Sequence, residues 1–371
     1  MTIGLIVNQT AVVDGVHLID LVAGSTAVEL GAVFAPEHGL RGLADAGELA
    51  VDGVDERTGV PVHSLYGANR QPTLDQLRNL DALVYDIQDV GCRFYTYIAT
   101  MGLAMQRAAE TGIPFVVLDR PEPQGGTRPQ GPIGAVDVGS FVSPYPIPSA
   151  YAMTAGELAQ AIKGEAWLPG LQSLDLRVIR VDGWRRGRIG QTTESDWVPP
   201  SPALPSLQSA RAYPGTVLLE ATTLSYGSGG PWPFSSVGAP WLDADTLAAA
   251  LNGRSLPGVR FESVTMTADP AIAPRARFPN QQVPAVRIAI TEPAAYEAVS
   301  TGVHLLAEAF AQADAGGHRV IDRPATFDLL AGSTSIRAGL EAGLPTADIV
   351  AGWQVELAAF EQIRGRYLLY P

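Results

Sequence analysis

Short apolar segments alternate with amphipathic helical segments over roughly the first 150 residues of the chain. Runs rich in β-branched residues predict strands at 3–7, 28–34, 62–66, 82–86 and 114–118. Apolar residues spaced three and four apart predict helices at 18–23, 74–79 and 97–111. Strands that alternate with helices are typical of a parallel sheet covered on both faces. The pattern therefore predicts an α/β fold.

The pattern changes at residues 143–149, a segment too rich in proline for regular structure. We place a domain boundary there, which divides the chain into units 1–148 and 149–371. Thr154 and Glu157 follow at the spacing of a capping box and predict the start of a helix. Later strands are expected at 174–181, 260–267 and 285–291, and long helices at 294–313 and 348–364.

Length and composition are those of a globular protein with full hydrophobic cores. Of 371 residues, 46% are hydrophobic and 17% are charged. The formal net charge is -13 at pH 7, which argues against a surface for nucleic acid or for an anionic membrane. We expect a small-molecule or oligosaccharide substrate and neither of those partners. Nothing in the sequence predicts an oligomeric state.

Cys92 is the only cysteine, so the chain forms no intrachain disulfide and no cysteine-based zinc site. The N-terminus begins at once as a strand, without a basic segment or a cleavage site for export. No apolar run reaches the ~18 residues of a membrane span. The sequence as written therefore predicts a cytoplasmic protein, or an extracytoplasmic one if a leader has been removed.

The common cofactor motifs are missing from the sequence. No strand is followed by G-x-G-x-x-G, and neither the P-loop pattern nor H-E-x-x-H occurs. The five histidines are too dispersed to indicate a metal site. We therefore expect no cofactor and no metal.

An acid, an imidazole and a guanidinium stand together where the second predicted strand ends. The apolar run stops at Pro36, and Glu37 and His38 follow it. Arg41 comes next, between glycines. Proline ends strand pairing and glycine permits a sharp turn, which places a side chain at the opening of a sheet. Taken alone the motif is an ordinary polar loop, but its neighbours change that interpretation.

The other strand ends carry similar side chains. In a parallel sheet all carboxyl ends meet at one edge, where ligands bind. The polar side chains after the first, third, fourth and fifth strands are Asn8, Tyr66, Arg70, Asp86, Gln88, Asp89, Arg93, Tyr95, Asp119 and Arg120. Together with Glu37 and His38 they favour one binding site over scattered polar loops.

Carboxylates, amides, tyrosines and arginines dominate this set, which suits a sugar. Glycoside cleavage needs one group that protonates the leaving oxygen and a second that stabilises or attacks the sugar carbon. Glu37 is our candidate for the protonated role, because Phe34 and Pro36 partly desolvate it and burial favours a neutral carboxyl. The candidates for the second role are Asp86, Asp89, Asp119 and Glu220.

Several long segments resemble the successive motifs of the bacterial exo-β-N-acetylmuramidases, a family long known only as a domain of unknown function. In the first half these segments are FAPEHGLRG (34–42), TGVPVHSLYG (58–67), DIQDVGCRFYTY (86–97) and VLDRP (117–121). In the second half they are PSP (200–202), YPGT (213–216), GAPW (238–241) and YLLY (367–370). The resemblance extends over essentially the whole chain.

The resemblance implies a Rossmann-like N-terminal domain that holds the active site and a smaller α/β C-terminal domain that closes the cleft. It implies hydrolysis that releases N-acetylmuramic acid from the non-reducing ends of peptidoglycan fragments, in bacterial cell-wall recycling, without a cofactor. The catalytic glutamate of the family corresponds to Glu37. Asp89 and Glu220 complete our catalytic candidates.

One segment departs from the family pattern. Where the family reads EGTNLSEGRGT, this chain has EATTLSYGSGG at 220–230. Thr223, Tyr226 and Ser228 replace an asparagine, a glutamate and an arginine, and Ala203 replaces another asparagine. Tyr226 is a candidate substrate-binding residue in this loop. Because lost polar groups alter discrimination between substrates, a closely related amino sugar is a possible substrate as well.

Two alternatives belong to other functional classes. One is a glycan-binding protein of the same fold without catalysis. The other is a sugar or sugar-phosphate enzyme of another reaction type, since a fold does not fix a function. The acidic cluster of the first half favours the glycoside hydrolase.

Overall fold

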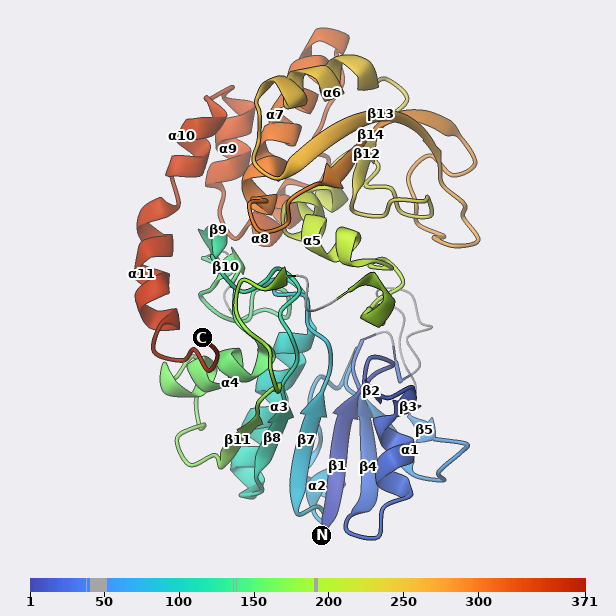
Figure 1. Cartoon of the computed structure of the whole chain (residues 1–371), viewed down its shortest axis with the longest axis vertical. Helices are drawn as coiled ribbons and strands as arrows, with labels where there is room; N and C mark the ends of the chain where they lie inside the picture. Colours follow the sequence, from blue (N-terminus) through green and yellow to red (C-terminus); the bar gives the residue numbers. More distant parts are fainter. Residues whose placement is uncertain (38, 41–51, 136, 138, 190–192) are drawn as a thin grey trace.

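In a computed structural model the chain forms two units. The first lies in the lower half of Figure 1 and the second in the upper half. The structure describes residues 1–37, 39–40, 52–135, 137, 139–189 and 193–371. A seven-stranded sheet is the centre of the first unit, and a three-stranded sheet is the centre of the second. The α/β class predicted from the alternating pattern is confirmed.

The seven strands of the first unit follow the order β11-β8-β7-β1-β4-β6-β5. Their bounds are β1 Thr2–Val7, β4 Glu29–Ala35, β5 Gly53–Val54, β6 Pro61–Ser64, β7 Ala82–Asp86, β8 Phe115–Leu118 and β11 Leu176–Ile179. All neighbours pair in parallel except β5 with β6. From β1 the chain builds outward to one side and then to the other, which is the strand order of a Rossmann fold.

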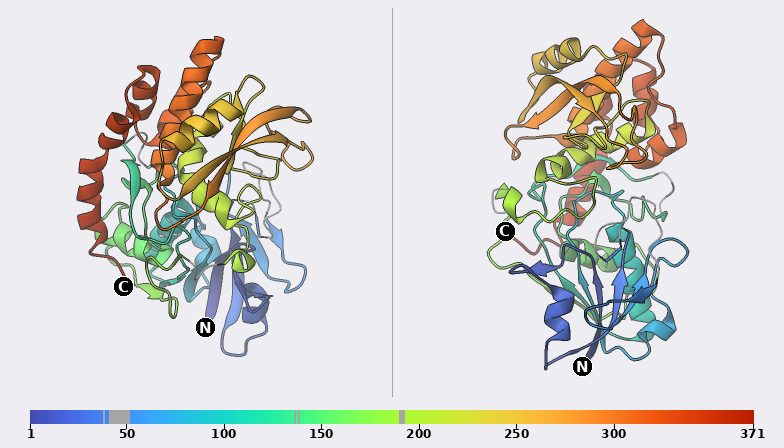
Figure 2. Two further views of the ribbon diagram at one scale, coloured as in Figure 1. Left: turned by 45° about the horizontal axis from the view of Figure 1, so that its top comes forward. Right: turned by 90° about the vertical axis from the view of Figure 1, so that its right-hand side faces the viewer.

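Helices cover this sheet on both faces, as Figures 1 and 2 show. They are α1 Leu18–Ala23, α2 Leu74–Leu77, α3 Tyr97–Thr111 and α4 Ala155–Gly164. Alternate residues of β1 point to opposite faces: Leu5 packs with Ile19 of α1, whereas Ile6 packs in the core that contains Met101 of α3. Because both faces are covered, the central strands are almost wholly apolar.

Two small antiparallel pairs complete the first unit. They are β2 Val12–Val13 with β3 Val16–His17, and β9 Gln130–Ile133 with β10 Pro148–Ala150. The predicted capping box precedes α4: Thr154 Oγ1 accepts a hydrogen bond from the Glu157 amide at 3.2 Å, and Glu157 Oε2 accepts one from the Thr154 amide at 3.0 Å.

The second unit packs helices around an antiparallel sheet of order β12-β14-β13. Its strands are β12 Ser236–Gly238, β13 Val259–Thr267 and β14 Gln282–Ile290. Its helices are α5 Leu207–Thr216, α6 Ala244–Gly253, α7 Ala298–Gly316, α8 Pro324–Ala331, α9 Ser335–Glu341, α10 Thr346–Ala351 and α11 Gln354–Arg364. Two short 3-10 helices are η2 Glu194–Asp196 and η3 Val217–Ala221.

Helices α5 and α7 approach each other closely because glycine faces glycine. A β-carbon at Gly215 would lie 1.9 Å from the carbonyl oxygen of Ala298, and one at Gly302 would lie 2.2 Å from that of Gly215. No side chain fits either distance. This contact fixes α5, and with it the start of η3, against the body of the second unit.

The periodicity predicted several elements at their observed bounds, among them α1, α3 and β7. The single helix expected at 348–364 is wrong. Gly352 ends α10, its amide bonding to the carbonyl of Asp348 at 3.1 Å, and Trp353 precedes α11. Glycine is a poor helix former, so the apolar pattern continues through a break in the backbone.

The strand pairing of the seven-stranded sheet bears on the domain boundary expected at residue 148. Strand β11 lies beyond it and pairs with β8, with Leu176 opposite Phe115. Helix α4 also packs on the first unit, against β8 and α3. We therefore propose that the Rossmann-like unit continues past β11. No helix in the described part of the chain combines the length and apolarity of a membrane span.

Candidate active site

A cleft of about 790 Å³ lies where the two units meet. The first unit contributes Glu37, just after β4, and the segment that leads into α3. The second unit contributes η3, the loop before β12 and the connection between β13 and β14. Enclosed clefts between domains are common sites for small ligands.

Glu37 faces this cleft from a tight turn after β4. The amide of Gly39 bonds to the carbonyl of Pro36 at 3.0 Å, and Gly39 has a φ of 72°, a conformation that favours glycine. Thr96 Oγ1 donates a 2.6 Å hydrogen bond to Glu37 Oε2. Because Thr96 occupies the N-cap position of α3, the carboxylate lies beside the N-terminus of that helix, where negative charge is stabilised.

Tyr66 also lies close to Glu37. Burial, the charge of Glu37 and a hydrogen bond to Glu37 raise the pKa of Tyr66 to about 12. The phenol is therefore protonated at neutral pH and available as a donor. Phe141 packs beside Tyr66, with ring centres 6.2 Å apart, and the guanidinium of Arg70 lies 4.6 Å from the centre of the Phe141 ring.

Glu220 faces the same cleft from η3 in the second unit. Burial raises the pKa of Glu220 to about 7; the positive charge of Arg323 opposes this rise and the negative charge of Glu37 adds to it. Arg323 also donates a hydrogen bond to the backbone carbonyl of Glu220. The cleft thus holds two carboxyl groups that interact electrostatically.

Aromatic rings form much of the remaining lining. The Tyr95 and Tyr97 rings meet edge to face, with centres 4.8 Å apart. Phe234 stacks on Tyr226 at 4.6 Å and meets Tyr213 edge to face at 4.7 Å. Most of these rings are buried against one another, whereas the half-buried Tyr226 retains surface on which a sugar ring can stack. Tyr95 and Tyr226, both candidates from the sequence, therefore lie with Glu37 and Glu220.

Other predicted residues lie outside the cleft and bond to one another. Arg120 forms a two-pronged contact with Asp86, with Nε–Oδ1 at 2.5 Å and Nη2–Oδ2 at 3.1 Å. Gln88 donates to the carbonyls of Asp89 and Pro121 at 2.8 and 2.9 Å. These contacts tie the loops after β7 and β8 together.

Asn8 and Asp89 are buried in the first unit and do not line the cleft. Asn8 Oδ1 accepts hydrogen bonds from the amide and the hydroxyl of Thr10 at 3.0 and 2.6 Å. Asp89 Oδ2 accepts one from the Gly91 amide at 2.7 Å and one from the Tyr151 hydroxyl. Burial raises the pKa of Asp89 to about 6. These contacts favour a structural role for both.

Arg93 connects the two units from a fully buried position. Its Nη2 donates to the carbonyl of Leu330 in α8 at 2.7 Å, and its Nη1 donates to Ser143 Oγ at 3.2 Å. Burial lowers the pKa of Arg93 to about 10. The side chain holds the interface behind the cleft and does not line it.

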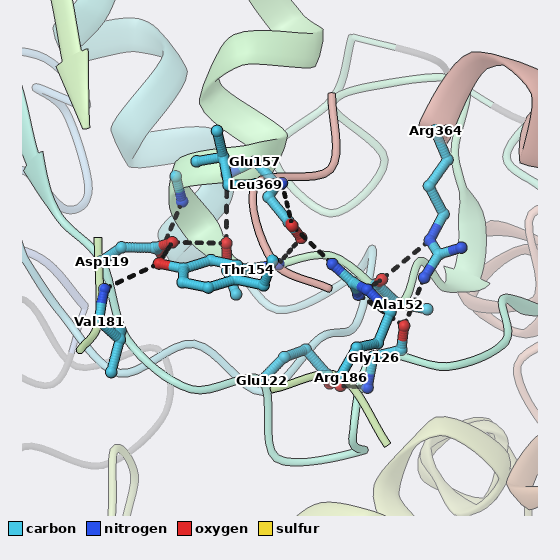
Figure 3. Close-up of polar contacts among 12 residues, drawn as sticks. Asp119, Glu122, Gly126, Ala152, Thr154, Glu157, Val181, Arg186, Arg364 and Leu369 are labelled. Carbon is cyan, nitrogen blue, oxygen red and sulfur yellow. Dashed lines mark hydrogen bonds and ion pairs between the residues drawn. The ribbon is translucent and has the colours of Figure 1, made fainter. Parts of the chain in front are cut away.

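Asp119 is bound by the C-terminal segment of the chain. Figure 3 shows Asp119 beside Thr154, with Glu157 and Leu369 of the same network. Its Oδ2 accepts hydrogen bonds from Thr154 Oγ1 at 2.7 Å and from the Tyr370 hydroxyl at 2.6 Å. Its Oδ1 accepts one from the Gly156 amide at 2.8 Å. Nearby, Glu157 accepts a 2.7 Å hydrogen bond from the Leu369 amide. Asp119 therefore anchors the tail of the protein.

Two predicted site residues, His38 and Arg41, lie outside the described residues. Conversely, sequence reasoning did not single out Thr96, Arg275, Arg277 or Arg323. Thr96 stands within the quoted segment 86–97, so its place beside a predicted helix start was available as a signal. The arginines lie in the second half, where no strand order was predicted, and no sequence signal linked them to Glu37.

Comparison with known proteins identifies the family of the chain. Residues 3–208 match the family model "Exo-beta-N-acetylmuramidase NamZ, N-terminal", and residues 211–370 match the corresponding C-terminal model. "Peptidoglycan beta-N-acetylmuramidase NamZ" of Bacillus subtilis (strain 168) is 39% identical, over 99% of this chain and 86% of that protein. The chain is thus placed among the glycoside hydrolases. It belongs to the exo-β-N-acetylmuramidase NamZ family.

Two solved structures share the fold. Both are DUF1343 family proteins of Bacteroides fragilis NCTC 9343, and each match covers 100% of this chain and 94% of the other. The first has a TM-score of 0.89 at 34% identity, and the second has a TM-score of 0.78 at 30% identity. The resemblance seen in the sequence motifs is confirmed.

Proposed function

We propose that this protein releases N-acetylmuramic acid from the non-reducing ends of peptidoglycan fragments by hydrolysis. Membership of the exo-β-N-acetylmuramidase family supports the reaction and the direction of attack. The structural observation that carries the proposal is the pair Glu37 and Glu220, which face one cleft from different units. Glycoside hydrolases commonly use two carboxyl groups in this way.

Glu220 is the proposed proton donor. Because burial and the charge of Glu37 outweigh Arg323 and raise its pKa to about 7, a large share of Glu220 is protonated at neutral pH. Its proton passes to the glycosidic oxygen as the bond from that oxygen to C1 of the sugar breaks. This assignment exchanges the roles of the two groups relative to the expectation from sequence, which gave the protonated role to Glu37.

Glu37 is the proposed charged partner. Its negative charge is among the causes that raise the pKa of Glu220, after the effect of burial. The carboxylate stabilises the positive charge that develops at C1. A water molecule then supplies the hydroxyl group of the released sugar, and its other proton passes to the Glu220 carboxylate, which restores the acid. Thr96 and Tyr66 hold the carboxylate in place.

The test is hydrolysis of a chromogenic β-N-acetylmuraminide, compared with the corresponding β-N-acetylglucosaminide. We expect the wild type to cleave the muraminide. Glu37→Gln and Glu220→Gln should each lower kcat by at least about 100-fold, as loss of general acid or charge stabilisation does.

The matched control is Glu356→Gln, which changes an exposed glutamate of α11 outside the cleft and should leave kcat unaltered. Tight binding of the muraminide without any product would instead identify a glycan-binding protein. Cleavage that survives in both cleft variants would contradict the assignment of the carboxyl groups.

A further inference from the structure

The connection between β13 and β14, residues 268–281, forms one wall of the cleft and carries two arginines into it. Arg275 and Arg277 line the cleft together with the apolar residues 272–274 of the same segment. We propose that Arg275 and Arg277 form a subsite for a carboxylate group of the substrate. The inference rests on the proposed function, because it names how the same cleft selects its sugar.

Backbone hydrogen bonds hold this connection in a defined conformation. The amide of Asp269 bonds to the carbonyl of Gly229 at 2.9 Å, which fixes the segment to the loop before β12. The amide of Asn280 bonds to the carbonyl of Ala268 at 2.9 Å and closes the base. A preformed wall loses little conformational freedom when a ligand binds, so the arginines retain most of their interaction energy.

The charge of the cleft differs from that of the protein. The whole chain has a formal net charge of -13. The charged residues that line the cleft are Glu37, Glu220, Arg275, Arg277 and Arg323. Proton uptake by Glu220, favoured by the burial that raises its pKa to about 7, leaves the lining more positive still. Such a lining attracts an anionic substrate to an otherwise acidic protein.

Arg277 is held in place by an acidic neighbour. Its Nη2 lies 2.6 Å from Asp322 Oδ2, and the two side chains are 30% and 31% exposed. A guanidinium has five N–H donors in a planar fork, so one contact of this kind orients the group while other donors face the cleft. Paired N–H donors match the geometry of a carboxylate.

The two arginines act electrostatically on tyrosines of different units. The charge of Arg275 opposes the effect of burial on the pKa of Tyr66, which belongs to the first unit. The charge of Arg277 similarly opposes burial at Tyr226, in the second unit. A carboxylate bound by these arginines therefore lies in the same cleft as Glu37 and Glu220.

Two parts of a peptidoglycan fragment supply a carboxylate: the lactyl ether of the muramic acid and the peptide attached to it. The experiment separates them by measuring kcat/KM for a chromogenic β-N-acetylmuraminide and for the same compound with a dipeptide on its lactyl group. Inhibition by free N-acetylglucosamine, which has no carboxylate, is measured in parallel. The variants are Arg275→Gln and Arg277→Gln.

We expect each variant to lower kcat/KM by about 10- to 100-fold on whichever muraminide presents the bound carboxylate, mainly through KM. This is the effect of losing a charge-assisted hydrogen bond. The inhibition constant of N-acetylglucosamine should change by less than about twofold. Loss on the simple muraminide identifies the lactyl carboxylate, and loss confined to the dipeptide compound identifies the peptide carboxylate.

Two further variants separate recognition from structure. Arg260→Gln changes an exposed arginine of β13 outside the cleft and should retain wild-type kcat/KM within about threefold. Asp322→Asn keeps Arg277 but removes the partner that orients it, so it should lower kcat/KM less than Arg277→Gln does. A loss in Arg260→Gln as large as in the cleft variants, or an equal loss of N-acetylglucosamine inhibition, would overturn the subsite.

The failure of the subsite and the failure of the function are distinguishable. In one outcome the wild type cleaves the muraminides, and the arginine variants cleave both compounds as well as the wild type does. That result overturns the subsite and leaves the proposed function standing. A wild-type protein that cleaves neither muraminide overturns the proposed function and the subsite with it.

Discussion

Thr96 donates its hydroxyl hydrogen bond to Glu37 and makes no side-chain bond to the backbone of its own helix. A threonine at the start of a helix usually caps that helix instead. Here the hydroxyl at the N-cap position of α3 donates instead to the Glu37 carboxylate after β4, with Oγ1 and Oε2 2.6 Å apart. The relationship links the start of a buried helix to the orientation of the candidate catalytic group.

Thr96→Val should impair catalysis more than folding. The change removes one hydrogen bond to a charged group, worth about 1.5–3 kcal/mol, so kcat/KM should fall by about 10- to 100-fold. The melting temperature should change by only a few degrees, because the hydroxyl caps no backbone amide of α3. Thr96→Ser keeps the hydroxyl and should restore most of the activity. A serine variant as impaired as the valine variant would contradict this role.

The activity should decrease as the pH rises above about 7. Glu220 must be protonated to act as an acid, and its pKa is raised to about 7 by burial, against the opposing charge of Arg323. Arg323→Gln removes that opposing charge, so the pKa should rise further and the alkaline limb of the kcat/KM profile should move to higher pH. Profiles from pH 5 to 9 for both proteins test this. A limb that moves to lower pH would exclude Glu220 as the acid.

The free energy of unfolding should fall as the pH rises from about 5 to 8. Burial raises the pKa of Glu122 to about 8 from an ordinary value of 4.5. The folded state therefore holds a proton that the unfolded state releases within this window, and the resulting stability is complete below the unfolded pKa and lost above the folded one. Asp89, with its pKa raised by burial to about 6, adds to the effect.

Glu122→Gln provides the test of that pH dependence. Urea unfolding at pH 5.5 and at pH 8.5 should give the wild type a difference of about 1–3 kcal/mol, and the variant a clearly smaller one. Glutamine keeps an oxygen for the Gln124 amide, which bonds to the wild-type carboxylate at 3.0 Å. An unchanged difference in the variant would assign the pH dependence to other groups.

Tyr370→Phe should destabilise the protein without affecting substrate binding. The hydroxyl donates to Asp119 at 2.6 Å and accepts from the Val181 amide at 2.9 Å. Its loss therefore leaves the buried Asp119 carboxylate and a half-buried backbone amide without that partner. The expected cost is about 1–3 kcal/mol of unfolding free energy, with KM unchanged. Tyr367→Phe, a change at a more exposed tyrosine of the same tail, should cost less. A raised KM in Tyr370→Phe would indicate instead that Asp119 takes part in substrate binding.

The alternating pattern predicted the sheet and its helices because burial on both faces leaves a strong signal in the sequence. Strand β7 and helices α1 and α3 coincide with their predicted ranges. The same reasoning predicted that polar side chains gather at one edge of the sheet. It did not show which of them are covered by other parts of the chain.

Residues of the second half of the chain determine which polar side chains at this edge are covered. Asp119 bonds to Tyr370, 251 residues away, and Arg93 bonds to Leu330, 237 residues away. No periodic pattern in the local sequence predicts either contact. Glu37 is exposed to the cleft instead, and Glu220 reaches the same space through η3. A sequence pattern predicts an edge, but tertiary contacts determine which side chains of that edge meet a ligand.

The polypeptide connects its two units at two separate places. It leaves the first unit near residue 208, and it returns through α11 to the tail that bonds to Glu157 of α4. Two attachments restrict rotation of the second unit relative to the first more than a single linker would. The position of Glu220 opposite Glu37 therefore depends on both ends of the second unit, and not on the segment near residue 208 alone.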